Sequence, residues 1–275
     1  MQPEANYYTL ITGASHGIGK ALSMECASRK MNLILVALPG PDLVNIVHAI
    51  RKNYGVDVVY IPIDLTETNA PEKVFNWVKD NELIVNMLIN NVGIGASGLF
   101  EYIGLDEYLM MIRLNNEVLV SLTYHFLPEL KKQPKAYILN MSSLEAFLPL
   151  PYKAVYAGTK NFVYSYSLAL REELKDSNVS LSVVCPGPVI TNREGLLRIK
   201  SHGKHSKAIV LLPKHVARAA IFYLLKGKGV IVPGFMNIAI TRLVRILPVQ
   251  FKMSLLERMF RVYRTHRNSR KELSA

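Results

Sequence analysis

Short apolar runs alternate with longer amphipathic stretches along the first 235 residues of the chain. The runs are nearly uninterrupted and rich in β-branched residues, which is typical of parallel strands covered on both faces. They predict strands at residues 8–12, 32–38, 56–63, 86–90, 136–141, 180–185 and 229–232. The amphipathic stretches predict helices at residues 17–29, 42–52, 71–81, 106–131, 155–176 and 214–226. This alternation predicts an α/β fold with a doubly wound, mostly parallel sheet of about seven strands.

The chain after residue 235 departs from this pattern, because it holds two amphipathic stretches separated by Pro248. We therefore divide the sequence into an α/β domain, residues 1–235, and a helical C-terminal extension, residues 236–275. The net charge is +12, and the stretch from Phe235 to Ala275 carries nine Lys and Arg against two acidic residues. The basic character is thus concentrated in the extension.

Apolar residues recur in the extension at three- and four-residue spacing, at Phe251, Leu255, Met259 and Val262, with arginines between them. A helix with such an apolar face docks on its own domain or on a second subunit, which is the arrangement that we favour. The alternative is a peripheral contact with an anionic membrane surface. No stacking platform or recognised motif accompanies the charge, so we expect no nucleic-acid partner.

The length of 275 residues suits one α/β domain. The first eight residues include Glu4 and no apolar run, so we expect no secretory signal peptide, and no apolar run approaches the roughly 20 residues of a membrane span. The only cysteines are Cys26 and Cys185, which we expect to be buried and reduced in a cytoplasmic protein. No spacing typical of a metal site occurs.

A glycine-rich turn joins the first predicted strand to the first helix, in the order Thr12-Gly13-Ala14-Ser15-His16-Gly17-Ile18-Gly19. Gly13 allows a tight turn, Gly17 allows the backbone to approach a pyrophosphate, and Gly19 allows close helix–strand packing. The helix N-terminus offers unpaired N–H groups to phosphates. Ser15, His16 and Ile18 belong to the same candidate dinucleotide site.

Three further motifs follow in order along the chain, after this TGxxxGxG turn. They are Asn90-Asn91-Val92-Gly93 after the fourth strand, the set Ser143, Tyr156 and Lys160, and Pro186-Gly187 followed by Val189 and Thr191. In these motifs the sequence resembles the short-chain dehydrogenases/reductases over residues 7 to about 235. Val92, in place of an alanine, and the insertion of Pro188 are departures from the family pattern. The resemblance implies a Rossmann-type domain that transfers a hydride between a nicotinamide cofactor and a carbonyl or alcohol.

The candidate catalytic residues are Ser143, Tyr156, Lys160 and an asparagine. Tyr156 and Lys160 are one helical turn apart and face the same side. A nearby ammonium stabilises a phenolate, so we expect Lys160 to lower the pKa of Tyr156 and make it a general acid and base. Ser143 can hydrogen-bond the substrate oxygen. The resemblance also gives Lys160 a contact with the nicotinamide ribose and places an asparagine in the preceding helix; of two adjacent asparagines we choose Asn115, because Thr123 follows it at the family spacing.

The second strand ends without the aspartate that holds the ribose 2′-hydroxyl in NAD-preferring relatives, and no acid occurs before Asp42. We therefore favour NADP(H), with Ser15 and His16 near the 2′-phosphate and NAD(H) as the alternative. The resemblance adds Asp64 and Leu65 beside the adenine. The predicted cofactor-binding set is Gly13, Ser15, His16, Gly17, Ile18, Gly19, Asp64, Leu65, Asn91, Val92, Gly93, Tyr156, Lys160, Pro186, Gly187, Val189 and Thr191.

The segments 94–100 and 144–151 flank the substrate side of this fold and are mostly apolar. Together with the resemblance to reductases of 3-oxoacyl chains and steroids, they favour a lipophilic ketone or secondary alcohol as substrate. Residues 191–212 are expected to form a mobile helical substrate loop. The family pattern implies a homodimer or homotetramer that assembles through the helices at 106–131 and 155–176. The alternative function is a catalytically silent NAD(P) sensor, or a membrane-peripheral binding protein, on the same scaffold.

Overall fold

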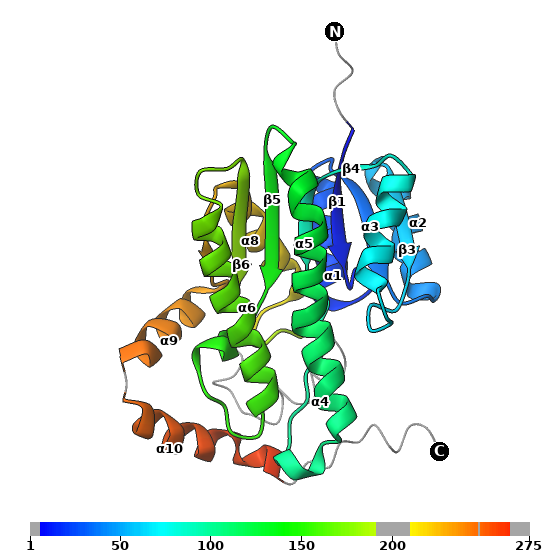
Figure 1. Ribbon diagram of the computed structural model, residues 1–275. Helices are drawn as coiled ribbons and strands as arrows, with labels where there is room; N and C mark the ends of the chain where they lie inside the picture. The colour runs from blue at the N-terminus through cyan, green and yellow to red at the C-terminus, as the bar shows by residue number, and fades with distance from the viewer. Residues whose placement is uncertain (1–5, 191–209, 247, 265–275) are drawn as a thin grey trace.

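The computed structural model describes residues 6–190, 210–246 and 248–264 (Figure 1). Seven parallel strands form one sheet in the order β3-β2-β1-β4-β5-β6-β7. All seven strands lie where the alternation of apolar runs predicts them. Their bounds are β1 Tyr7–Thr12, β2 Asn32–Ala37, β3 Val58–Pro62, β4 Ile84–Asn90, β5 Ala136–Met141, β6 Val179–Val184 and β7 Val230–Ile231.

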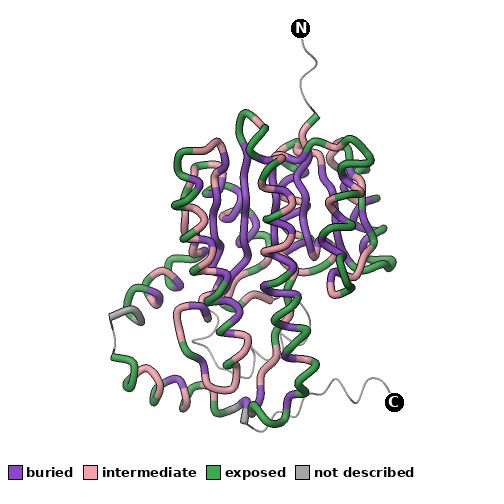
Figure 2. Tube along the Cα trace, in the orientation of Figure 1, coloured by how far each residue is buried: buried purple, intermediate pink, exposed green. Residues whose placement is uncertain are grey.

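Helices cover both faces of the sheet, which confirms the doubly wound architecture. Side chains of α1 (Gly17–Ser28), α2 (Pro41–Tyr54) and α8 (Pro213–Leu225) form one core layer with the sheet. Those of α3 (Ala70–Asp80) and α5 (Val118–Lys131) form the other, beside α6 (Ala154–Glu173). The strands are buried along their length while the helices expose their outer faces (Figure 2). Both cysteines are buried and form no disulfide, as predicted.

The predicted helix over residues 106–131 is less regular than the sequence pattern indicated. It begins as α4 (Leu105–Ile112), passes through a π-helical segment, Arg113–Glu117, and continues as α5. The adjacent Asn115 and Asn116 lie in the π-helical segment, and both are buried. Such local widening of a helix is rare and is found mostly at functional sites.

The C-terminal extension forms two helices on either side of Pro248, as predicted: α9 (Phe235–Ile246) and α10 (Val249–Phe260). A short 3-10 turn, Arg261–Arg264, follows α10. Both helices lie beside the end of the sheet where the strands terminate (Figure 1). Among the described helices, none is both long and apolar enough to cross a membrane.

Candidate functional site

The candidate site lies where the chain leaves the carboxyl ends of β1, β4, β5 and β6. The strand order reverses between β1 and β4, which are neighbours in the sheet although β2 and β3 separate them in sequence. In open α/β sheets, ligands bind in the crevice at such a switch point. The glycine turn follows β1 and the Asn91–Gly93 segment follows β4, so two predicted motifs meet at this crevice.

The glycine turn has the geometry that a dinucleotide requires. Gly13 and Gly17 have positive φ angles of 64° and 52°, which side-chain-bearing residues rarely adopt. A Cβ on Gly19 would lie 1.9 Å from the Gly13 carbonyl oxygen. Helix α1 begins at Gly17 and directs its free N–H groups toward the turn, which suits a pyrophosphate. We call the turn and this helix end, residues 12–19, the glycine cradle. Ser15 and His16 lie at its rim, and Ile18 packs on the core beside it.

Asn91 fixes the cradle to the neighbouring strand. Its side-chain Nδ2 donates to the Thr12 carbonyl at 2.9 Å, and its backbone N–H donates to Thr12 Oγ1 at 3.0 Å. The N–H of Val92 donates to the same hydroxyl at 3.1 Å. The side-chain amide of Asn91 is therefore hydrogen-bonded to the glycine turn, and this residue supports the shape of the candidate cofactor site.

Asn115 reaches the site through the π-helical segment. Its side-chain amide makes two 2.9 Å hydrogen bonds with the backbone of Ile94, one as acceptor and one as donor, and donates to Thr159 Oγ1 at 3.0 Å. A Cβ on Gly93 would lie 2.8 Å from Asn115 Oδ1 and 3.2 Å from Lys160 Nζ. The side-chain amide of the neighbouring Asn116 donates to the Thr159 carbonyl instead, whereas Asn115, the predicted choice, lies beside Lys160.

Ser143, Tyr156 and Lys160 converge beside the end of β5. Lys160 is only 5 % exposed, and its Nζ donates to the Met141 carbonyl at 3.1 Å and lies 5.9 Å from the centre of the Tyr156 ring. Ser143 hydrogen-bonds to the Tyr156 hydroxyl and accepts the N–H of Glu145 at 3.1 Å. A hydroxyl pair beside a buried ammonium can bind a carbonyl oxygen and supply a proton to it.

The pKa of Tyr156 differs in direction from the sequence-based expectation. Burial raises the pKa of Tyr156, the negative charge of Glu145 raises it further, and the hydrogen bond with Ser143 lowers it. Burial also lowers the pKa of Lys160 to about 8. The expected lowering of the Tyr156 pKa is therefore not found in the protein alone, because burial disfavours the charged form of both groups.

Glu145 and Lys153 are site residues that the motif analysis missed. Lys153 Nζ donates to Glu145 Oε1 at 2.7 Å and lies 6.0 Å from the centre of the Tyr156 ring. The second carboxylate oxygen of Glu145 is buried and accepts no hydrogen bond from the described chain. The sequence held one signal, because Glu145 is the only charged residue in the apolar segment 144–151.

The rim of the cradle carries a carboxylate that the sequence argument discounted. Asp42, in the first turn of α2, lies 3.2 Å from His16 Nε2, and His16 Nδ1 lies 2.9 Å from Ser15 Oγ. All three are candidate neighbours of the adenosine ribose. His16, which the sequence places near a 2′-phosphate, thus contacts the carboxylate of Asp42 in the structure.

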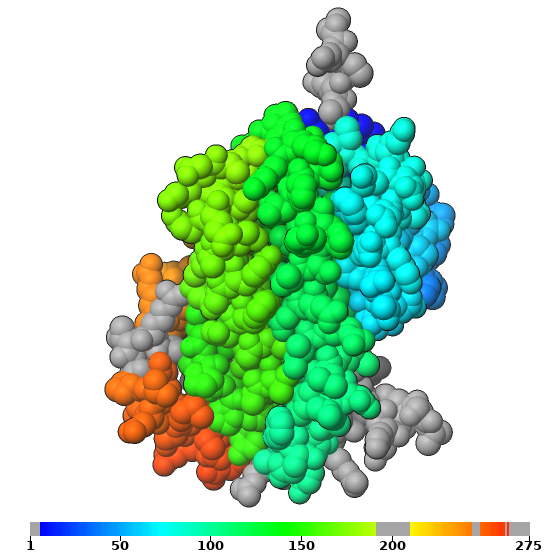
Figure 3. Space-filling view, viewed as in Figure 1, coloured from blue at the N-terminus to red at the C-terminus, as the bar shows by residue number. Residues whose placement is uncertain are grey.

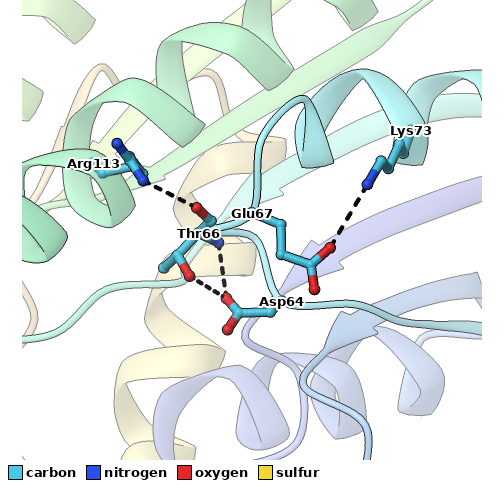
Figure 4. A network of polar contacts seen from close by, with 5 residues as sticks. All are labelled: Asp64, Thr66, Glu67, Lys73 and Arg113. Carbon is cyan, nitrogen blue, oxygen red and sulfur yellow. Dashed lines mark hydrogen bonds and ion pairs between the residues drawn. The ribbon is translucent and has the colours of Figure 1, made fainter.

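Asp64 closes the turn after β3 (Figure 4). Its Oδ1 accepts hydrogen bonds from the backbone N–H and the hydroxyl of Thr66, at 2.8 and 2.7 Å. Arg113, at the start of the π-helical segment, donates to the Thr66 carbonyl at 3.3 Å. The next residue, Leu65, is buried in the core. Asp64 thus holds the predicted adenine-side turn in shape, and Arg113 joins that turn to the helix that carries Asn115.

The loop after β6 joins the site to the extension. The Pro186 carbonyl accepts the N–H of Leu144, and a Cβ on Gly187 would lie 2.7 Å from the side chain of Asn237 in α9. Val189 pairs with Leu211, which brings together the two ends of the segment predicted as the substrate loop. Thr191 and most of that segment lie outside the described residues.

Helix α10 docks beside the catalytic residues, but not through the predicted apolar stripe. The residues that pack against the domain are Leu256, with Leu150 and Ala157, and Phe260. Tyr152 also donates to Glu257 at 3.0 Å. Phe251, Leu255 and Met259 are exposed, and the side chain of Val262 lies outside the described residues.

Comparisons with known proteins give the family. A model of the short chain dehydrogenase family matches residues 8–200. A very-long-chain 3-oxoacyl-CoA reductase of Kluyveromyces lactis is 31 % identical over 78 % of this chain and 62 % of its own length. Human 17-beta-hydroxysteroid dehydrogenase type 3 is 33 % identical over 67 % of this chain and 59 % of its own. The chain thus matches about three fifths of the length of these relatives.

Two similar solved structures hold nicotinamide cofactors. A short-chain dehydrogenase from Sphingobium yanoikuyae in complex with NADPH has a TM-score of 0.74 at 26 % identity, covering 88 % of this chain and 96 % of that one. A short chain dehydrogenase/reductase from Burkholderia phymatum in complex with NAD has a TM-score of 0.76 at 22 % identity, covering 88 % and 94 %. The family match, the fold and the ordered motifs agree: the chain belongs to the short-chain dehydrogenases/reductases.

Proposed function

We propose that this protein is an oxidoreductase that transfers a hydride between NADP(H) and a lipophilic ketone or secondary alcohol. The observation that carries the proposal is the convergence of Ser143 and Tyr156 beside the buried Lys160, next to the glycine cradle. A silent cofactor sensor, the alternative, has no use for a hydroxyl pair and an ammonium in this arrangement.

The chain's own residues divide the reaction between them. Bound at the glycine turn, NADPH would supply the hydride. Tyr156 and Ser143 bind the substrate oxygen through their hydroxyls, and the Tyr156 O–H gives its proton to that oxygen as negative charge develops there. Lys160 holds a positive charge beside the phenolate that remains, and its place is fixed by the Met141 carbonyl. Asn115 positions the backbone of Ile94, and its Oδ1 lies near Lys160 Nζ beside Gly93.

Apolar side chains around Tyr156 favour a lipophilic substrate. Ile94, Ala96 and Val155 pack with Tyr156 on a small buried cluster of Ile103, Tyr108 and Met111. On the other side, Leu148 and Phe260 pack beside Ala157. The named relatives, a 3-oxoacyl-CoA reductase and a hydroxysteroid dehydrogenase, act on substrates of this kind by their names.

The function is tested by following the loss of NADPH absorbance with a panel of candidate substrates. The apolar candidates are 3-oxoacyl thioesters, steroid ketones and small diketones, and sugars are the polar comparison. Turnover of the apolar ketones is the expected result. Activity confined to sugars or polyols would contradict the lipophilic substrate. Cofactor binding without turnover on any arm would favour the sensor.

Asp42 gives a test of the cofactor preference. The carboxylate of Asp42 repels a 2′-phosphate and competes with it for His16, so Asp42→Asn is expected to raise the preference for NADPH over NADH. Because both partners of the ion pair are exposed, we expect only a roughly two- to five-fold change. The measurement is the ratio of kcat/KM for the two cofactors. Asp80→Asn, at the end of α3, is the matched control. A preference that moves toward NADH would contradict the placement of the phosphate beside Asp42.

Glu145 gives a test through pH dependence. Its charge raises the pKa of both Tyr156 and Lys160, and both groups must be protonated for reduction in the proposed mechanism. With the pKa of Lys160 at about 8, kcat/KM for reduction is expected to fall as the pH rises through that value. Glu145→Gln removes the negative charge, so the alkaline limb is expected to move to lower pH.

The control for this experiment is Glu129→Gln, since Glu129 pairs with Lys132 on the surface of α5. It is expected to leave the profile in place. A limb that moves to higher pH in Glu145→Gln, or that does not move, would show that Glu145 does not act on the reacting groups.

The proposed assembly is a homodimer or homotetramer in the cytoplasm. Apolar side chains stay exposed on the two helices that the family pattern indicates, with Tyr124 of α5 75 % exposed and Phe162 of α6 nearly half exposed. Exposed aromatic residues on adjacent helices suit a subunit contact. The buried thiols of Cys26 and Cys185, which form no disulfide, suit a reducing compartment.

A further inference from the structure

Helix α10 has two apolar faces, and among the described residues one is covered and the other is exposed. The inner face, with Leu256 and Phe260, packs on the domain. The outer face, one residue earlier along the helix, presents Phe251, Leu255 and Met259, whose exposed fractions are 57 %, 44 % and 61 %. These three positions repeat every four residues and form one stripe. Exposed side chains of this size in a row mark a surface that binds something.

The preceding helix adds to the same region. Phe235, Met236 and Leu243 of α9 are exposed as well. In the space-filling view, α9 and α10 form a projecting part of the surface at the end of the molecule away from the N-terminus (Figure 3). The extension therefore leaves apolar side chains uncovered on two consecutive helices.

The charge of the extension indicates which kind of partner suits the exposed apolar side chains of α9 and α10. Residues 235–264 contain six Lys and Arg and a single acid, Glu257. That acid is engaged, since it accepts from Tyr152 and pairs with Arg261. Arg242 of α9 and Arg258 of α10 are exposed beside the apolar residues. An apolar stripe flanked by cations fits a partner that has an apolar interior and a negatively charged surface.

A second copy of the chain fits this surface poorly. In a two-fold contact the same patch lies on both sides, so the arginines of one copy would face those of the other. We propose that the outer face of α9 and α10 binds an anionic lipid surface, with Phe251, Leu255 and Met259 inserted at the headgroup boundary and Arg242 and Arg258 on the phosphates.

The inner face of α10 connects this surface to the site. Lys153, which pairs with Glu145 beside Tyr156, lies 5.7 Å from the centre of the Phe260 ring and 5.4 Å from that of Tyr263. A bilayer under α10 would therefore lie beside the apolar substrate side of the site, where a lipophilic ketone can enter from it. Entry of substrate from the bilayer rests on the proposed reductase function, whereas lipid binding by α10 does not.

The test is sedimentation of the full chain with vesicles, without substrate or cofactor. Vesicles of phosphatidylcholine with phosphatidylglycerol are compared with vesicles of phosphatidylcholine alone. The expected result is binding to the anionic vesicles that weakens as salt is raised. The triple variant F251S/L255S/M259S is expected to bind roughly tenfold more weakly or worse. The double variant R242Q/R258Q is expected to lose about tenfold on anionic vesicles only.

The matched control removes three exposed apolar side chains elsewhere, in V44S/Y60S/I84S on α2, β3 and β4. It is expected to bind vesicles like the unaltered chain. Circular dichroism and NADPH binding verify that each variant is folded. Absence of binding by the unaltered chain, or equal binding by the triple variant, would overturn the proposal. The oligomeric state is also measured by sedimentation velocity without vesicles. If the unaltered chain self-associates and the triple variant alone does not, the face belongs to a contact with a second copy instead.

Discussion

Tyr156→Phe is expected to reduce the turnover of a ketone by NADPH by roughly 10²–10⁴-fold, the usual contribution of a positioned proton donor. The change removes one oxygen and keeps the ring, which packs among Ile94, Ala96 and Val155. It leaves Ser143 without its hydroxyl partner and leaves Lys160 with no phenolate to stabilise. The loss is expected in kcat rather than in cofactor affinity, because the glycine cradle is untouched.

The measurement is single-turnover decay of NADPH absorbance, with NADPH affinity followed by fluorescence. Tyr60→Phe is the matched control, since Tyr60 lies on β3 at the far edge of the sheet. A Tyr156→Phe enzyme that keeps more than about a tenth of the activity would rule out this hydroxyl as the main proton donor. Lost activity together with lost NADPH binding would point to a structural role instead.

The sequence was sufficient to predict the architecture and most residues of the candidate site, because both follow from local spacing along the chain. Parallel strands with two buried faces produce uninterrupted apolar runs, and the glycine turn is one contiguous segment. Tyr156 and Lys160 lie one turn apart on a helix that the pattern predicts. Their meeting with Ser143 and Asn115 was taken from the family resemblance, and the structure places all four around the end of β5.

What the sequence could not provide depends on packing across the fold. The direction of the Tyr156 pKa follows from its burial and from Glu145, neither of which appears in the Tyr-x-x-x-Lys spacing. The π-helical segment that widens the helix at Asn115 has no sequence signal of its own. The Glu145–Lys153 pair joins residues on different elements, a 3-10 turn and the start of α6.

The face on which α10 docks shows the same limit. Periodicity alone identifies Phe251, Leu255 and Met259 as an apolar stripe, and a stripe is the natural candidate for the docked face. The structure instead buries Leu256, the next residue after Leu255, because the contact also joins Glu257 to Tyr152 and brings Phe260 to Lys153. A helix with apolar residues on both sides gives no sequence signal for which side the domain takes.

Gly19→Ala tests the cofactor cradle, and we expect it to abolish useful cofactor binding. The added methyl would lie 1.9 Å from the Gly13 carbonyl oxygen and 2.6 Å from Asn91 Nδ2, and the nearer atom belongs to the backbone. Helix α1 must therefore move away from the turn. Overpacking of this kind costs about 1–3 kcal/mol of stability. A shift of about 1 Å in a binding constellation costs roughly 10²-fold, which is the loss of NADPH affinity that we expect.

Gly158→Ala is the matched control, because Gly158 is also helical but a Cβ there meets nothing within 4 Å. Alanine in a helix is favoured over glycine by about 0.5–1 kcal/mol, so this variant is expected to be slightly more stable and to bind NADPH normally. Thermal unfolding with and without NADPH measures both quantities in one experiment. If Gly19→Ala unfolds at a lower temperature, yet NADPH raises its unfolding temperature as much as that of the unaltered chain, the close contact at Gly19 serves packing alone. If the gain from NADPH disappears while the apo protein stays folded, the cradle holds the cofactor as the close approach of Gly13 and Gly19 indicates.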